Sequence, residues 1–329
     1  MSKRFCYLTI LLVLLFSNVL VGCQAQVESP TEELQTLRLT LPFIPNVQFA
    51  PVYVAIEKGY FSDAGFDVQI EYGNENDAVA LVGAGDQYFT VASGEQVLLA
   101  RSQGLPVTYV LAWYQKFPVG VASLAEENIV ELDNLRGKDI GIPGLFGASY
   151  IGFRALLAAG GLTEDDVTLL SIGFNQVEAI MTGQVQAGVI YLPNEPIVLR
   201  DQGYEVNTMG VSDFLELVGN GLVTNETAVE ENPEMVQAFV EAFLQGIRDT
   251  IDDPYEAYEI SKNYVENLGD PDQDVQFQVL ETSIELYLAP RLGYSDSAGW
   301  INMQEVLLDM GLLEAPIDLE LAFTNQFIP

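Results

Sequence analysis

Between residue 36 and about residue 192, the chain repeats one pattern of hydrophobic and polar positions. Short runs that alternate apolar and polar residues, or that are rich in β-branched residues, predict strands, and amphipathic segments between them predict helices. Each predicted helix is followed directly by a glycine, a residue that commonly ends helices. The predicted strands are residues 37–41, 66–70, 88–92, 107–112, 139–142, 167–171 and 187–191, and the predicted helices are residues 49–58, 77–84, 94–103, 148–159 and 177–182. Their alternation predicts parallel α/β units.

From about residue 232, the pattern changes to helical spacing alone. Apolar residues recur at helical intervals over residues 235–247, after Pro233, which suits the first turn of a helix. Further helices are predicted at residues 254–264, 275–288 and 299–310, with aromatic stripes that are interpreted as core. A helical final third that returns to an N-terminal α/β lobe makes that lobe discontinuous. We therefore expect the chain to cross between lobes near residues 119–123 and 210–224.

The N-terminus has the pattern of a secretory leader. Lys3 and Arg4 precede an apolar run at residues 5–16, which is short for a membrane-spanning helix, and small residues follow it. This predicts export and cleavage of the leader.

The tetrad Leu-Val-Gly-Cys at residues 20–23 resembles a bacterial lipobox. The resemblance implies a lipoprotein signal peptide at residues 1–22, acyl chains such as palmitate on Cys23, and a flexible tether at residues 23–35. The protein is then expected on the outer side of the cell membrane, held by its lipid. The alternative is an ordinary cleaved signal with an incidental cysteine.

Composition narrows the classes of function. The chain has 47 acidic and 13 basic residues, no histidine and 2 cysteines. A net charge of −34 opposes binding to nucleic acid or to anionic lipid headgroups. The absence of histidine removes the commonest general base, and the predicted processing leaves neither Cys6 nor Cys23 for a disulfide, a metal site or a nucleophile. We therefore expect no enzyme, no metal and no cofactor.

Several segments together resemble the NMT1/THI5-like periplasmic binding proteins of the SsuA/THI5 superfamily. The main one is Phe-Ile-Pro-Asn-Val-Gln-Phe-Ala-Pro-Val-Tyr-Val-Ala at residues 43–55, followed by Glu-Lys-Gly-Tyr-Phe at residues 57–61. Weaker matches are residues 104–107, residues 132–138, Asn232-Pro233, and Trp300 with residues 307–312. The resemblance covers nearly the whole chain after residue 36.

The resemblance implies an α/β fold of the two-lobed, type II periplasmic-binding-protein class. Each lobe is then a mostly parallel sheet flanked by helices, and two hinge crossings join the lobes. Residues 36–120 would form the first part of lobe 1, residues 121–212 lobe 2, and residues 213–329 the mainly helical return to lobe 1. A monomer that captures a small molecule in its cleft and works with an ABC permease and its ATPase is expected.

One departure from the family's pattern matters for the ligand. Members that handle the thiamine pyrimidine, including the fungal synthase branch, carry a histidine shortly after the Pro-Asn pair. Here residues 48–51 are Gln-Phe-Ala-Pro, and the chain has no histidine. This argues against a thiamine-precursor synthase and weakens the assignment to a pyrimidine precursor.

The expected cleft lies at the C-terminal ends of the strands, where α/β folds bind ligands. The candidate ligand-binding residues are Phe43, Asn46, Gln48, Phe49, Tyr53, Ser93, Gln96, Trp113, Tyr114, Phe146, Ser149, Tyr150, Asn175, Tyr191, Asn194 and Glu195. Aromatic faces suit a planar heterocycle, and amide side chains can donate and accept along its edge. Each aromatic could instead pack in a lobe core. Lys116 is the one cation expected in these loops.

A neutral, planar ligand follows from these residues, and one branch of the family takes up riboflavin. Riboflavin is therefore the predicted ligand, as cargo and not as a cofactor. A thiamine pyrimidine precursor (hydroxymethylpyrimidine or formylaminopyrimidine) remains an alternative, as does a sulfonate or nitrate held by backbone N–H groups of residues 144–147. Glu195 is predicted to accept from a ring N–H or from ribityl hydroxyls, or else to be a helix N-terminal acid favoured by the dipole. A paired-carboxylate hydrolase and a purely structural lipoprotein are further alternatives.

Overall fold

The computed structural model of the protein describes residues 34–269 and 275–329, and residues Leu34–Pro329 form one compact unit. The signal peptide, Cys23 and nearly all of the expected tether lie outside the described residues. In the described ranges, no helix combines the length and the apolar character that a membrane span requires.

The first sheet is mixed and has the order β2-β1-β3-β10-β4. Its strands are β1 (Gln35–Pro42), β2 (Phe66–Gly73), β3 (Phe89–Ser93), β4 (Val107–Ala112) and β10 (Asn220–Asn225). Strand β1 runs parallel to β2 and β3, whereas β10 runs antiparallel to both β3 and β4. Strand β10, which follows the return of the chain from the second sheet, thus lies between β3 and β4 and runs in the opposite direction to both.

The second sheet has the order β7-β6-β8-β5-β9 and the same arrangement. Its strands are β5 (Val119–Leu124), β6 (Asp139–Ile142), β7 (Thr168–Ser171), β8 (Ala187–Tyr191) and β9 (Val206–Gly210). Strand β6 pairs in parallel with β7 and β8, and β5, which enters from the first sheet, runs antiparallel to β8 and β9. In each described sheet, one strand runs antiparallel to the other four, so both sheets are mixed. Two such sheets flanked by helices confirm the predicted fold class.

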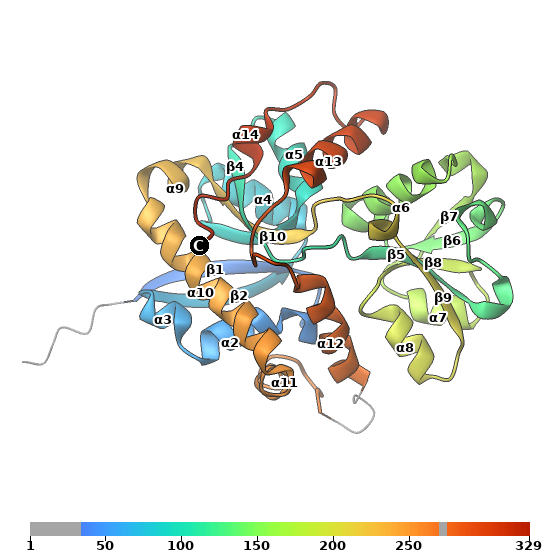
Figure 1. Ribbon diagram of the computed structural model, residues 1–329, viewed down its shortest axis with the longest axis horizontal. Coiled ribbons are helices and arrows are strands. Elements are labelled where there is room, and N and C mark those ends of the chain that lie inside the picture. The colour runs from blue at the N-terminus through green and yellow to red at the C-terminus, as the bar shows by residue number, and fades with distance from the viewer. Residues whose placement is uncertain (1–33, 270–274) are drawn as a thin grey trace, which may run out of the picture. The chain divides into compact units, whose positions relative to one another are not determined.

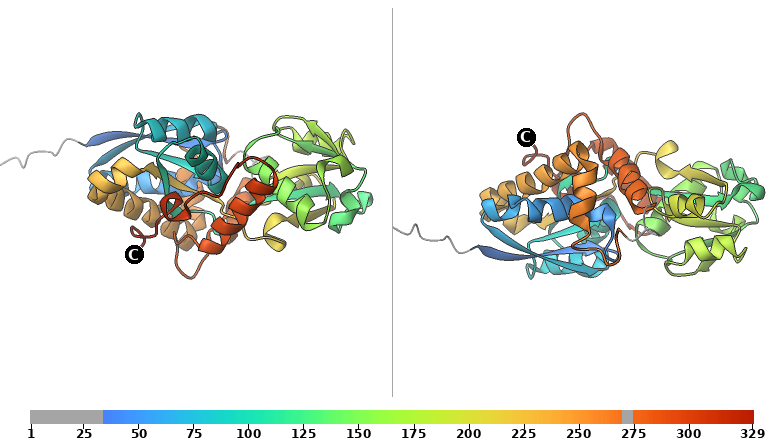
Figure 2. Two further views of the ribbon diagram at one scale, coloured as in Figure 1. Left: turned by 90° about the horizontal axis from the view of Figure 1, so that it is seen from above. Right: turned by 90° about the horizontal axis from the view of Figure 1, so that it is seen from below.

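Helices flank both sheets (Figures 1 and 2). The helices are α2 (Ala50–Glu57), α3 (Tyr60–Asp63), α4 (Glu75–Ala84), α5 (Gly94–Ser102), α6 (Gly147–Ala159), α7 (Gln176–Met181), α8 (Glu195–Asp201), α9 (Glu226–Glu231), α10 (Pro233–Asp252), α11 (Pro254–Ser261), α12 (Val275–Tyr287), α13 (Ser297–Asp309) and α14 (Leu319–Ala322), with 3-10 turns at Val47–Phe49, Ala125–Glu127, Leu132–Leu135, Glu164–Asp166 and Val211–Asp213. Helices α10 and α11 pack on α2 beside the first sheet, and α6, α7 and α8 pack on strands of the second.

The predicted strands and helices are present, with ends that shift by a few residues. The predicted crossing at residues 119–123 is wrong in one respect: these residues form strand β5, which is buried apart from Leu124. The chain first passes between the sheets at residues 113–118. It returns at residues 211–219, within the predicted crossing at residues 210–224. Strand β10, which lies inside the second predicted crossing, is likewise a buried central strand.

Helix α10 anchors the first sheet's core through aromatic contacts. The ring of Phe239 stacks on Phe89 of β3 with ring centroids 4.0 Å apart, and it also contacts Phe61. The helix approaches α2 closely at Gly246. A Cβ atom at this position would collide with the Pro51 carbonyl oxygen and lie 2.8 Å from the Ala55 Cβ. Only glycine fits there without a shift of one helix.

Replacing Gly246 with alanine is expected to lower the free energy of unfolding by about 1–3 kcal/mol, the usual effect of overpacking. An unhindered Gly→Ala change inside a helix would instead stabilise it by up to about 1 kcal/mol. Urea unfolding followed by circular dichroism measures the difference. Gln278→Ala, at an exposed position of α12, is the control for adding a helical alanine. A Gly246→Ala protein more stable than the wild type would contradict the close approach of α10 and α2.

Candidate functional site

A cavity of about 510 Å³ lies where the loops of the two sheets meet. Its lining comes from segments that follow β1, β2, β4, β6, β7 and β8, together with the start of β10. The lining residues are Pro42, Phe43, Ile44, Pro45, Asn46, Gln48, Phe49, Tyr72, Gly73, Asn74, Glu75, Asn76, Val91, Trp113, Tyr114, Pro143, Phe146, Gly147, Ala148, Ser149, Phe174, Gln176, Tyr191, Asn194, Glu195 and Asn220. The volume falls within the range of small-molecule sites.

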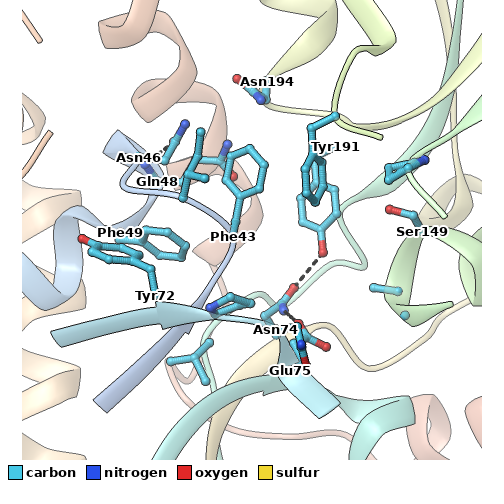
Figure 3. Close-up of a pocket in the computed structure, with 18 of the residues that line it drawn as sticks. Phe43, Asn46, Gln48, Phe49, Tyr72, Asn74, Glu75, Ser149, Tyr191 and Asn194 are labelled. Atoms are coloured by element: carbon cyan, nitrogen blue, oxygen red, sulfur yellow. Dashed lines mark hydrogen bonds between the residues drawn. The ribbon is translucent and has the colours of Figure 1, made fainter. Parts of the chain in front are cut away.

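Most of the candidate residues from the sequence lie on this lining. They are Phe43, Asn46, Gln48, Phe49, Trp113, Tyr114, Phe146, Ser149, Tyr191, Asn194 and Glu195. They come together because parallel strands end at the same edge of each sheet, so that successive loops converge. Figure 3 shows Phe43, Tyr191 and Ser149 around one space although they are far apart in the sequence.

Three other candidates are not among the lining residues and lie one layer behind them. Tyr53 is fully buried on α2, and its hydroxyl shares a hydrogen bond of 2.8 Å with the lining residue Tyr72. Ser93 is fully buried and donates to Glu75. Gln96 is buried within the first turn of α5. Tyr53 and Gln96 lie on the helices α2 and α5, whereas Ser93 is the last residue of strand β3.

The last two candidates point elsewhere. Tyr150 lies on α6 and accepts a hydrogen bond from Arg154 one turn later, at 3.0 Å. Asn175 folds back and donates to the carbonyl oxygen of Ile172, also at 3.0 Å. In both cases a local partner within four residues fixes the side chain away from the cavity.

Aromatic rings form one wall of the cavity. The ring of Phe49 lies 6.1 Å, centroid to centroid, from both Tyr72 and Trp113. Trp113 in turn contacts Tyr114 and Tyr287 at 5.8 and 5.6 Å. Figure 3 shows Phe49 and Tyr72 side by side on this wall. Such a group of rings presents flat apolar surface with polarised edges to a planar ligand.

Phe43 stands at the meeting point of the two sheets' loops. Its φ of 90° lies in a region that bulky residues rarely adopt, so the backbone is strained there. Its ring meets that of Phe174, from the loop after β7, edge to face at 4.9 Å. Strain of this kind persists only where the surroundings enforce it, and it concentrates at functional sites.

The opposite side of the cavity is a polar chain that ends on Glu75. The Tyr191 hydroxyl lies 3.4 Å from Asn220 Oδ1, and Asn220 Nδ2 donates to Glu75 Oε1 at 2.8 Å (Figure 3). Glu75 is the first residue of α4, which Asn74 caps by accepting a hydrogen bond from the Asp77 N–H. The helix dipole favours a negative charge at that position.

Burial raises the pKa of three carboxyl groups near these hydrogen-bonded side chains. The pKa of Glu75 is raised by burial, against the lowering effect of its hydrogen bonds from Ser93 and Asn220. The pKa of Glu95, fully buried behind Ser93, is raised to about 8 by burial and by the charge of Glu75. Burial also raises the pKa of Glu195 to about 7. Clustered perturbed acids of this kind mark candidate functional sites.

Amide groups occupy the end of the cavity near β1. Asn46 accepts from the Gln48 N–H at 2.9 Å and so begins the short turn that carries Phe49. The Gln48 side-chain oxygen accepts from the Tyr114 hydroxyl at 3.1 Å. These bonds fix the orientation of both amides, which leaves their remaining donors for a ligand.

The charged residues of the cavity lining disfavour an anionic ligand. Within the described chain, the cavity lining holds Glu75 and Glu195 but no lysine or arginine, and Lys116 is not among the lining residues. An anion bound there would lack the cationic partners that phosphate and sulfonate sites normally use. The cavity therefore favours a neutral or cationic ligand over an anionic one.

Sequence reasoning missed Tyr72, Asn74, Glu75, Asn76 and Asn220, all of which line the cavity. Strand β2 continues to Gly73, three residues beyond its predicted end, and α4 begins at Glu75, two residues before its predicted start. The segment that turns into the cavity therefore falls between the predicted strand at residues 66–70 and the predicted helix at residues 77–84. The available signal was Asn74, an N-cap residue three positions before Asp77.

The fold and the cavity define a solute-binding protein of the periplasmic type. The family model described as "NMT1/THI5 like" matches residues 46–257, and the chain belongs to that family. The solved alkanesulfonate-binding protein SsuA from Xanthomonas axonopodis pv. citri, bound to MOPS, has the same fold. Its TM-score is 0.69 at 17% identity, over 89% of this chain and 99% of that one.

Two relatives are similar in sequence over most of their lengths. The riboflavin-binding protein RibY of Chloroflexus aurantiacus is 41% identical over 304 residues, which cover 90% of this chain and 87% of that protein. The formylaminopyrimidine-binding protein of Halalkalibacterium halodurans is 31% identical over 333 residues, 98% of this chain and 99% of that protein.

Proposed function

We propose that this protein captures riboflavin and delivers it to the permease of an ABC importer, without turning it over. The observation that carries the proposal is the 41% identity to a riboflavin-binding protein over 90% of the chain. Delivery to a permease and its ATPase follows from the usual role of solute-binding proteins. Export, a lipid anchor on Cys23, a place on the outer side of the membrane and a monomeric state belong to the same proposal.

The chemistry of the cavity supports a flavin. Phe49, Tyr72 and Trp113 supply apolar faces for a tricyclic ring, and ring stacking of this kind adds to simple burial. A flavin ring and its ribityl chain carry both hydrogen-bond donors and acceptors, which match the amides of Asn46 and Asn194. The ligand is neutral, in keeping with a lining without cations.

Titration of riboflavin with the compact unit Leu34–Pro329 tests the function. We expect saturable quenching of flavin emission with a stoichiometry near one, because aromatic side chains would lie against the ring. The control is the unfolded protein in urea, which should not quench saturably. Absence of quenching together with thermal stabilisation by formylaminopyrimidine would replace riboflavin by the pyrimidine as the ligand.

The pyrimidine precursor stays the second candidate for one specific reason. A relative named for formylaminopyrimidine is 31% identical along 98% of the chain. The Glu75 carboxylate at the cavity can accept a hydrogen bond from the amino group of an aminopyrimidine. Competition between the pyrimidine and riboflavin in the same titration ranks the two ligands directly.

A further inference from the structure

The Ser93 hydroxyl lies between two carboxyl groups and has one hydrogen to give. Its oxygen is 2.5 Å from Glu75 Oε2 and 2.5 Å from Glu95 Oε1. If both carboxyl groups were charged, the Ser93 hydroxyl could donate its one hydrogen to only one of them. The other carboxylate would then lie against a lone pair of the Ser93 oxygen, which is repulsive. Both contacts are satisfied only if one carboxyl is protonated and donates to the Ser93 oxygen. The geometry thus requires a single proton shared by the pair.

The surroundings decide which carboxyl carries that proton. Glu95 is fully buried, and its Oε2 has no hydrogen-bond partner among the described residues. Glu75 accepts hydrogen bonds from the Ser93 hydroxyl and the Asn220 amide, and its Oε2 also accepts from the backbone N–H of Ser93 at 3.4 Å. Apart from Ser93, the side chain that contacts Glu95 Oε1 is Gln96, whose Nε2 lies 3.5 Å away. A buried charge with fewer and longer hydrogen bonds is less favourable than one with several. The proton therefore resides on Glu95, which donates to Ser93, which donates to the Glu75 carboxylate.

We propose that Glu75 is the specificity-determining acceptor of the cavity, a carboxylate that binds a hydrogen-bond donor of the ligand, and that Glu95 is a positioning residue that holds it through the proton on Ser93. The proposal deepens the function proposed above and rests on it. Its ligand chemistry is a neutral N–H or O–H donor. In riboflavin this donor is either the imide N–H of the ring or a hydroxyl of the ribityl chain.

Other titratable groups face the pair and enter its pH dependence. Burial raises the pKa of the phenols of Tyr109 on β4 and Tyr191 on β8, and the nearby charges of Glu75 and Glu95 raise it further. Glu195 on α8 accepts a hydrogen bond from the Tyr191 N–H at 3.0 Å and titrates nearby with a pKa of about 7. Glu195→Gln therefore separates its contribution from that of Glu95.

The pH dependence of binding has a defined sign. Above the Glu95 pKa of about 8, the pair carries two charges and Ser93 can satisfy only one of them. A ligand that fills the cavity removes water from Glu75 and makes the second charge less favourable still. Binding therefore takes up protons near pH 8, and affinity falls as pH rises from 7 to 9.

The experiment measures the affinity of the purified protein for riboflavin between pH 6.5 and 9. We expect Glu75→Gln to weaken binding by about 10- to 100-fold, the loss typical of a hydrogen bond to a charged group. We expect the wild-type affinity to fall at least about fivefold from pH 7 to 9 and that of Glu95→Gln to change less than about twofold, since glutamine donates to Ser93 at every pH. Glu230→Gln, an exposed acid on α9, should behave as wild type.

Two ligand analogues identify the donor. Riboflavin methylated at the imide nitrogen lacks the ring donor, and lumiflavin lacks the ribityl hydroxyls. The analogue without the relevant donor should bind the wild type more weakly than riboflavin does, and should lose little further affinity in Glu75→Gln. Equal effects of Glu75→Gln on riboflavin and on both analogues would show that Glu75 binds neither donor.

The possible outcomes distinguish failure of this proposal from failure of the proposed function on which it rests. A wild type that fails to bind riboflavin at any pH defeats the proposed function and this proposal with it. If the wild type binds riboflavin, two results overturn this proposal but not the proposed function. One is a folded Glu75→Gln variant with the affinity of the wild type, and the other is a Glu95→Gln variant with the pH profile of the wild type. Circular dichroism verifies that each variant is folded. If Glu95→Gln does not fold, the proton uptake that accompanies riboflavin binding to the wild type is measured instead, by calorimetry in buffers of different ionisation enthalpy. Absence of proton uptake at pH 8 would overturn the proposal.

Discussion

Replacing Trp113 with alanine is expected to lower the free energy of unfolding by about 3–5 kcal/mol and to abolish tight binding of the ligand. The side chain is 1% exposed, and its ring lies 5.4–6.1 Å from those of Phe49, Tyr114, Phe243 and Tyr287. Alanine would leave a large void between these rings, because each is fixed by further contacts and cannot collapse into it. The same void would remove the centre of the aromatic wall.

The two tryptophans of the chain provide a matched test. Trp300 is also fully buried, stacked on Phe323 at 5.0 Å, but it is not among the residues that line the cavity. In Trp300→Phe, binding should still change the emission of the remaining Trp113. In Trp113→Phe, the emission of Trp300 should be insensitive to ligand. Urea unfolding gives the stability of Trp113→Ala. A loss below about 1 kcal/mol, or wild-type affinity in that variant, would contradict a structural and binding role for this ring.

The fold was largely readable from local patterns. Alternation at residues 37–41 and glycines at helix ends, such as Gly85, identified the parallel α/β units because each signal is local to one element. The strands that follow each crossing, β5 and β10, could not be predicted from local patterns. Strand β10 begins Asn-Gly and lies buried between two strands, so it lacks the polar alternation of a half-exposed strand and resembles a turn followed by an apolar run.

Site residues at the ends of strands could be predicted from the sequence, whereas those whose position depends on packing could not. Trp113 and Tyr191 follow from their places at the ends of apolar strands. Glu75 could not be found in the same way, because a shift of two residues in the start of a helix decides whether it faces solvent or the cavity. The contact of Ser93 with Glu75 joins two segments that are 18 residues apart and has no signature in sequence spacing, although Ser93 and Glu95 are neighbours in one segment.

The acids that line the cavity or lie behind it lower the stability of the folded protein by a measurable amount. Glu75, Glu95 and Glu195 all have a raised pKa with burial as the largest cause, and no cation of the described chain lines the cavity beside them. A core built for stability alone would place apolar residues there. Their presence beside a cavity favours recognition of a ligand donor over a purely structural role.

This cost predicts how stability depends on pH without any ligand. The pKa of Glu95 is about 8 in the folded protein against an ordinary value of 4.5. Between these values the folded state holds a proton that the unfolded state releases, so the free energy of unfolding falls as pH rises from about 4.5 to about 8. Glu75 and Glu195 act in the same direction. For Glu95 alone the full fall is roughly 3–5 kcal/mol.

Glu95→Gln is therefore expected to be more stable than the wild type at pH 8.5, by an amount that shrinks as the pH is lowered towards 5. Glutamine remains neutral and can donate to Ser93, so it reproduces the protonated acid without its titration. Urea unfolding at pH 5, 7 and 8.5 gives the difference, and Glu230→Gln controls for removing one of many acidic charges. A difference independent of pH would show that Glu95 is charged in the folded protein, because only a proton held in the folded state and lost on unfolding produces this slope.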